Sequence, residues 1–185
     1  IRKRLLQYDD VLNRQREIVY SIRNDVLLED DPGKILIELV EEEVEGRLGG
    51  VPLTEFKATR TEDMPEIESL LASWVNVTFP LSIRVDDFVG KSEEEAKNYL
   101  LEKVISAYEG KRKLEDPDQL QSLERYVVVN AVDVHWQDHL TEMDELRRSV
   151  GLRGYGQKDP LSEYKNEAFK AFEEMMVSMR SDVCS

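Results

Sequence analysis

The chain has 185 residues, of which 41% are hydrophobic, so it can form one ordinary domain or two small ones around a packed core. Its 39 acidic and 25 basic residues give a formal net charge of −14, which argues against nucleic-acid binding because phosphate contacts need clustered lysine and arginine. The one cysteine, Cys184, excludes a disulfide framework within the chain and suits a reducing cytosolic compartment, and no apolar run approaches the roughly 20 residues that span a bilayer.

The first predicted element is a helix over about residues 1–28. Its stripe of mainly apolar side chains recurs at a 3-4-3-4 spacing and comprises Leu5, Tyr8, Leu12, Gln15, Val19, Ile22 and Val26. A long helix with so narrow a stripe needs partners along its length, so we interpret it as a scaffold strut. No capping residue precedes Ile1, and we therefore expect the chain to be a fragment that starts inside a longer helix.

Residues from about 33 to 112 are predicted to form a separate, mainly helical module. Helices are expected over residues 35–48 and 64–77, the first of them with Pro32 at its first position. Ser92 and Glu95 fit a capping box that opens a third helix, which ends near Lys113. Residues 79–88 are rich in β-branched and aromatic side chains, which favours an extended segment. No cluster of chemically active side chains stands out in this module.

The last third of the chain predicts two long helices joined by a short turn. Asp116–Pro117 is a start signal for a helix of about 34 residues, roughly 50 Å long, which Gly151 is expected to stop. Asp159–Pro160 repeats the start signal. The apolar positions of the final helix are Leu161, Tyr164, Ala168, Phe172, Met175, Met179 and Val183. A short connection makes the two helices antiparallel neighbours, so we expect a helical hairpin.

Candidate catalytic and metal sites are weak. His135 and His139 are four residues apart, as in a metal site on a helix, but Trp136 stands where a zinc protease motif needs glutamate. Two histidines without a third ligand are more often packing or surface residues. Neighbouring acids such as Asp9–Asp10 have no companion nucleophile, and the glycines near residue 154 lack the Gly-Lys-Ser/Thr ending of a phosphate loop. We assign no catalytic residue and no metal ligand; a metalloenzyme that uses the two histidines remains a minor alternative.

The predicted turn has an unusual charge pattern. Residues 147–158 contain four basic side chains and no acidic one, in a chain of net charge −14. The helix dipole accounts for Arg147 and Arg148 near a helix C-terminus, but it does not account for Arg153 and Lys158. Between them lies Tyr155, flanked by two glycines. The residues alone leave two interpretations open, in which the ring either folds back as a plug or projects as a probe.

Several long motifs resemble the SecA family, the bacterial protein-translocation ATPases. Residues 5–11, with Gln15-Arg16, Tyr20-Ser21 and Arg23-Asn24, resemble that family's long scaffold helix. The match to its two-helix finger is stronger and comprises Trp136-x-x-His139-Leu140, Met143-Asp144-x-Leu146-Arg147, Leu152–Pro160, Glu163-Tyr164-Lys165 and Phe169. The resemblance covers about residues 1–28 and 120–185. Family members commonly have alanine where this chain has Gly156, and His135 is not a family residue.

The resemblance implies a motor protein that uses ATP and magnesium, bound in domains outside this chain, to push unfolded preproteins through the SecYEG channel. The finger tip would contact channel and polypeptide through Tyr155, with Arg153, Gly154, Gly156, Gln157 and Lys158 around it. The implied partners are SecYEG, the preprotein, the nucleotide-binding domains and, through the parent protein, the anionic membrane, with no nucleic acid. The implied location is cytoplasmic, peripheral at the inner face of the bacterial plasma membrane. We expect no ATP hydrolysis and no bound cofactor in this chain alone.

Together these observations predict an all-α fold with a long scaffold helix, an antiparallel two-helix hairpin and an inserted, mainly helical wing domain. The predicted domains are residues 1–28 (scaffold helix), 29–115 (wing) and 116–185 (scaffold return and finger). The alternative from another class is a free-standing helical adaptor that binds a partner through its apolar stripe.

Overall fold

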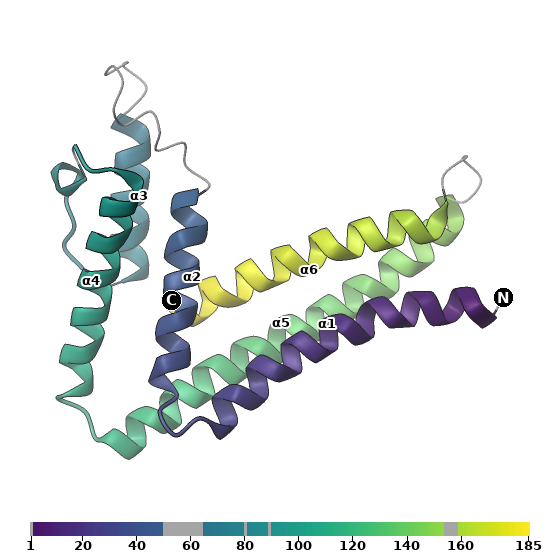
Figure 1. Cartoon of the computed structure of the whole chain (residues 1–185), viewed down its shortest axis with the longest axis horizontal. Coiled ribbons are helices and arrows are strands. Elements are labelled where there is room, and N and C mark those ends of the chain that lie inside the picture. Colours follow the sequence, from purple (N-terminus) through teal and green to yellow (C-terminus); the bar gives the residue numbers. More distant parts are fainter. Residues whose placement is uncertain (1, 50–64, 80, 89, 154–158) are drawn as a thin grey trace. The chain divides into compact units, whose positions relative to one another are not determined.

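The computed structural model describes residues 2–49, 65–79, 81–88, 90–153 and 159–185 (Figure 1). These residues form six α-helices and one short 3-10 helix, and they contain no strand, so the predicted all-α fold is confirmed. The elements are α1 (Arg2–Leu28), α2 (Gly33–Gly49), α3 (Pro65–Thr78), η2 (Val85–Asp87), α4 (Glu93–Arg112), α5 (Pro117–Arg153) and α6 (Pro160–Cys184). No described helix combines the length and apolar character that crossing a membrane requires.

The chain folds as two compact units. Unit 1 comprises residues 1–32 and 123–182, and contains α1 with most of α5 and α6. Unit 2 comprises residues 33–122 and 183–185, and contains α2, α3, η2 and α4. The division into functional domains at residues 1–28, 29–115 and 116–185 stays a prediction.

Unit 1 is built from three long helices. In Figure 1, α5 and α6 run antiparallel side by side, and α1 lies along α5. The predicted stripe of α1 is buried at Val26 (0% exposed), Val19 (1%) and Gln15 (6%) and half-buried at Tyr8, Leu12 and Ile22. Within unit 1 the predicted stripe of α6 is buried at Leu161, Tyr164, Ala168, Met175 and Met179 and half-buried at Phe172; its last member, the buried Val183, belongs to unit 2. Regular apolar spacing on each helix thus produces the shared core, as expected for long helices that pack lengthwise.

Polar side chains cap the N-termini of three helices at the positions that the sequence predicts. The Asp116 carboxylate accepts a hydrogen bond at 3.0 Å from a backbone N–H of the first turn of α5, and the Asp159 carboxylate accepts one at 3.3 Å in α6. At α4 the capping box is complete. The Ser92 N–H donates to the Glu95 carboxylate at 2.6 Å, and the Glu95 N–H donates to Ser92 Oγ at 3.3 Å. These bonds satisfy backbone donors that have no partner within the helix.

Two predicted helix boundaries differ from the structure. Gly151 does not stop α5, which continues to Arg153. A glycine inside a helix costs only about 1 kcal/mol relative to alanine, and the fully buried Val150 beside it supplies packing that offsets this cost. In addition, α2 begins at Gly33, so Pro32 lies just ahead of the first helical residue rather than at it.

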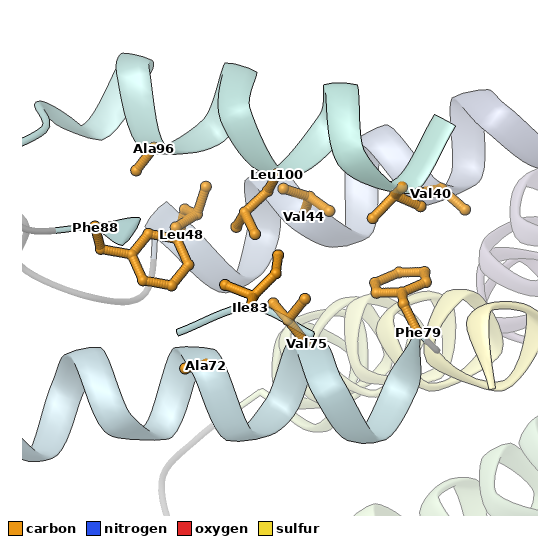
Figure 2. Packing of buried hydrophobic residues seen from close by; sticks show 11 residues of the cluster. Val40, Val44, Leu48, Ala72, Val75, Phe79, Ile83, Phe88, Ala96 and Leu100 are labelled. Atoms are coloured by element: carbon orange, nitrogen blue, oxygen red, sulfur yellow. The ribbon is translucent and has the colours of Figure 1, made fainter. Parts of the chain in front are cut away.

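The core of unit 2 is apolar. Figure 2 shows side chains from α2, α3, α4 and the segment between α3 and α4 converging on one another. The buried members are Val40, Val44, Leu48, Ala72, Val75, Phe79, Ile83, Phe88, Ala96, Leu100 and Val104. These buried members carry no titratable or nucleophilic side chain, although Tyr99 and Cys184 pack against them, so the cluster serves to hold the helices of unit 2 together.

Residues 79–88 do not form the extended segment that their composition favours. Residues 81–84 are irregular, and Val85–Asp87 form η2. The side chain of Asn76 on α3 explains how Ile83 is held. Asn76 Nδ2 donates to the Ile83 carbonyl oxygen, and the Ile83 N–H donates to Asn76 Oδ1, both at 2.8 Å. One amide side chain thus supplies the two hydrogen bonds that a neighbouring strand would otherwise provide.

Candidate functional site

The predicted tip joins the two helices of the hairpin. Gly154, Tyr155, Gly156, Gln157 and Lys158 lie outside the described residues, between the end of α5 and the start of α6. Arg153 is the last residue of α5, and its side chain also lies outside the described part. The choice between a plug and a probe for Tyr155 therefore stays open. The structure does describe the parts of α5 and α6 that adjoin the tip, which we call the stem of the hairpin.

The stem of the hairpin has a continuous core next to the tip. Buried side chains of α5 and α6 meet in one cluster, which contains Met143, Val150, Tyr164, Ala168 and Ala171. Partly buried side chains of α1 pack against this cluster, namely Tyr8, Val11 and Leu12, together with Leu146 of α5. Helix α1 is therefore a third helix of the stem. Burying one face of each helix against the other two stabilises their mutual positions.

A layer of aromatic and charged side chains connects the three helices of the stem. The rings of Tyr8 and Tyr164 lie with their centroids 4.8 Å apart at an angle of 58°. The guanidinium carbon of Arg147 lies 5.4 Å from the centroid of the Tyr8 ring, and Arg147 Nη1 is 3.0 Å from Asp9 Oδ1. Arg147 therefore has a specific partner on α1 beyond its favourable place near a helix C-terminus.

Tyr164 is the most enclosed member of this layer. Its side chain is 0% exposed, and its hydroxyl has no hydrogen-bond partner among the described residues. Burial raises the pKa of the Tyr164 phenol, and the positive charge of Arg147 partly offsets that rise. An unpaired buried hydroxyl costs free energy, so the ring of Tyr164 carries the stabilising contribution of this residue.

A second, polar layer crosses the same three helices. His139 on α5 is 2% exposed, and its Nε2 lies 2.9 Å from Gln15 Oε1 of α1. Gln15 Nε2 in turn donates to the Ala168 carbonyl oxygen of α6 at 3.0 Å. An amide oxygen can only accept, so His139 Nε2 must carry the proton, and Nδ1 is left buried without a described partner. In the neutral imidazole this contact selects the Nε2–H tautomer, and burial, which lowers the pKa of His139, favours that neutral form.

The two histidines have different partners. His135 Nε2 lies 2.9 Å from Asp182 Oδ2 on α6, whereas His139 binds Gln15 and packs near Trp136 and Phe172. Each imidazole is thus occupied by a protein contact. Within the described ranges, no three His, Cys, Asp or Glu side chains are grouped so that they could hold a metal ion.

Unit 1 is expected to lose stability as the pH falls through the acidic range. Burial lowers the pKa of His139, so at mildly acidic pH the unfolded chain binds a proton at this position that the folded chain does not. The free energy of unfolding is therefore unaffected by His139 above the ordinary histidine pKa, and it decreases as the pH falls below that value. The measurement is urea unfolding between pH 8 and pH 5, with His139→Phe as the control. A pH dependence that is unchanged in His139→Phe would contradict this assignment.

Sequence reasoning missed most of these contacts. Nothing in the sequence distinguishes Asp9 from the other acids or gives Arg147 a role beyond the helix dipole, because residues 138 positions apart give no local signal of contact. Gln15 did give a signal, since it is an amide within an otherwise apolar stripe. A buried amide needs a partner, and His139 was a candidate on the facing helix.

Comparison with known proteins assigns these elements to a family. Residues 1–185 match the family model described as the SecA wing and scaffold domain. The chain is 37% identical over 183 residues to the protein translocase subunit SecA of Thermodesulfovibrio yellowstonii, covering 99% of this chain and 19% of the relative. It is 38% identical over 193 residues to the subunit of the same name from Deinococcus radiodurans, covering 99% of this chain and 21% of that relative. The chain thus spans about a fifth of the length of these curated relatives.

Proposed function

Because the chain belongs to the SecA family and matches its wing and scaffold domain, we propose that it is the mechanical part of an ATP-driven protein translocase. In this proposal the α5–α6 hairpin contacts the SecYEG channel and the unfolded preprotein that moves through it. Nucleotide and magnesium bind in other domains of the parent protein, because this sequence contains no Gly-x-x-x-x-Gly-Lys-Ser/Thr loop. The chain itself would then transmit motion without catalysing a reaction.

The observation that carries the proposal is the packed stem that ends at the tip segment. Val150 and Leu161 lie on either side of that segment, and they are 0% and 9% exposed. A core that reaches both helix ends makes the hairpin stiff up to its tip. A stiff element with a tyrosine at its end is suited to transmit force to a polypeptide of any sequence, because a tyrosine ring makes apolar and π contacts without requiring one partner residue.

The charges near the tip fit a docking role. Arg147 is bound to Asp9, whereas Arg148 beside it is exposed; Arg153 and Lys158 follow in the sequence of the tip segment. Basic side chains beside a contact surface steer the approach of acidic surfaces on a partner. We propose the cytoplasmic mouth of the channel as that partner, with the protein peripheral at the inner face of the plasma membrane. We assign contact with anionic lipid to the parent protein, because this chain carries a net charge of −14.

Exposed apolar side chains on unit 1 fit contact with the other domains of the parent protein. Leu28 on α1 is 82% exposed, Tyr126 on α5 is 66% exposed and Phe169 on α6 is 61% exposed. Large apolar side chains in water are stabilised when a partner covers them. We propose that the nucleotide-binding domains of the parent protein are such partners, which is the arrangement that a scaffold requires.

The direct test of this function is Tyr155→Ala in the full-length protein. We expect the rate of preprotein translocation to fall roughly tenfold, because an aromatic anchor at a contact surface carries a large share of its binding free energy. The ATPase rate should stay close to that of the wild type, because the residue lies outside the nucleotide-binding domains. Tyr155→Phe, which keeps the ring, serves as the control and should retain most of the activity. Unchanged translocation by Tyr155→Ala would refute the role of the tip.

A further inference from the structure

The tip end of the hairpin is connected to α1 through one side chain with two contacts. Arg147 lies near the end of α5, and its Nη1 is 3.0 Å from Asp9 Oδ1 on α1. The same guanidinium lies 5.4 Å from the centroid of the Tyr8 ring on α1. A planar guanidinium that meets both a carboxylate and an aromatic face fixes direction as well as distance, which a point charge such as lysine does not.

The connection continues into α6. The Tyr8 ring that faces Arg147 also lies 4.8 Å from the ring of Tyr164, which is fully buried near the start of α6. One stack therefore contains a cation from α5, a ring from α1 and a ring from α6. A shift of α1 along its axis would separate Asp9 from Arg147 and Tyr8 from Tyr164 at the same time.

The contacts of Arg147 matter more for the relative position of the helices than for the stability of the fold. The side chains of Arg147 and Asp9 are 34% and 52% exposed, and an ion pair so accessible to water contributes little to folding stability. Its removal should therefore leave the stem folded. The same two helices carry a comparable exposed pair at their other end, where Arg23 makes two hydrogen bonds to Asp133 at 2.9 and 3.3 Å. That pair is a matched control, because it joins α1 to α5 far from the tip.

We propose that Arg147 is a positioning residue that holds the tip end of the α5–α6 hairpin against α1, so that a movement of α1 is passed to the tip. This inference rests on the proposed function of the hairpin for its effect on translocation, but the positioning itself does not depend on that function. The carboxylate of Asp9 and the ring of Tyr8 are the two surfaces on α1 against which Arg147 is held.

The positioning is measured directly by electron spin resonance on the full-length protein. Spin labels at Asp10→Cys on α1 and Asn166→Cys on α6, both exposed positions, report the distance between the two helices near the tip. Cys184 and every further cysteine of the full-length protein are first replaced by serine, so that only these two positions are labelled. Arg147→Met should shift this distance distribution to longer values and broaden it. Arg23→Met should leave it as in the wild type. A distribution that is unchanged in Arg147→Met would overturn the proposal.

The consequence for transport is measured with the same variants in a reconstituted translocation assay. Arg147→Met should lower the rate of translocation about fivefold to tenfold, in the range usual for coupling between sites, while the ATPase rate changes less than twofold. Asp9→Asn should have a similar effect, and combining the two should add little, since both remove one contact. Translocation by Arg147→Met equal to that of Arg23→Met would overturn the role of Arg147 in transport. If Tyr155→Ala is also without effect, the proposed function fails instead, and the spin-label result still decides the positioning.

Discussion

Replacing Tyr164 by alanine should lower the free energy of unfolding of unit 1 by about 3–5 kcal/mol, the range found when large aromatic side chains are removed from a core. The side chain is 0% exposed and packs against Tyr8 and the cluster beneath the tip. Three helices meet at this ring, so neither α1 nor α5 can close the cavity without losing its other contacts. The effect is measured by urea unfolding of the purified chain, followed by circular dichroism at pH 7.

Tyr164→Phe separates the ring from the hydroxyl. The hydroxyl of Tyr164 is buried without a described hydrogen-bond partner, so its removal should leave stability unchanged or raise it slightly. The same absence of a partner means that the ring alone accounts for the large loss in Tyr164→Ala. If Tyr164→Phe were as destabilising as Tyr164→Ala, the hydroxyl would have to be hydrogen-bonded, and the description of this layer would be wrong.

Gln15→Leu should destabilise unit 1 by about 1–3 kcal/mol, the cost of leaving a buried donor without its acceptor. Leucine has a similar size and fits an apolar stripe, so the loss comes from the hydrogen bonds rather than from a cavity. His139 Nε2 would lose its acceptor at 2.9 Å, and the Ala168 carbonyl oxygen would lose its side-chain donor at 3.0 Å. The measurement is again the free energy of unfolding at pH 7.

The double variant Gln15→Leu/His139→Leu distinguishes an unpaired polar group from a general packing defect. Replacing both partners by apolar side chains removes the unsatisfied donor, so the double variant should be more stable than the sum of the two single losses predicts. Strictly additive losses would show that Gln15 and His139 do not interact in solution.

The sequence predicted the helices of this protein well, because their signals are local. Asp116 and Asp159 each cap a helix within a few residues, and the apolar spacing of α6 alone identifies its buried face. The prediction that the helix ends at Gly151 is wrong, because the packing of Val150 next to it outweighs the small intrinsic preference of glycine against helix. The prediction of an extended segment over residues 79–88 is wrong, because the partner of Ile83 is a side chain on α3, and composition does not reveal such a partner.

The candidate site was predictable only in part. Long motifs predict the hairpin, which the structure contains, and a tip that stays a prediction, but they give no indication that α1 is part of the stem. The contacts between Arg147 and Asp9 and between Tyr8 and Tyr164 join residues that are far apart in the chain. Such contacts depend on the register in which three amphipathic helices pack, and that register is determined by the whole core. The residues that position a site are therefore harder to find from sequence than those with a recognisable motif.

The amide of Asn76 has a consequence for how the irregular segment after α3 meets other polypeptides. An extended chain can pair as a β-strand with another polypeptide wherever that polypeptide exposes an unpaired backbone N–H and carbonyl oxygen. At Ile83 both groups already bind the Asn76 side chain, at 2.8 Å each. An extended polypeptide that passes Ile83 therefore meets no open template there for β-augmentation, and the irregular segment after α3 is protected at this residue against strand pairing.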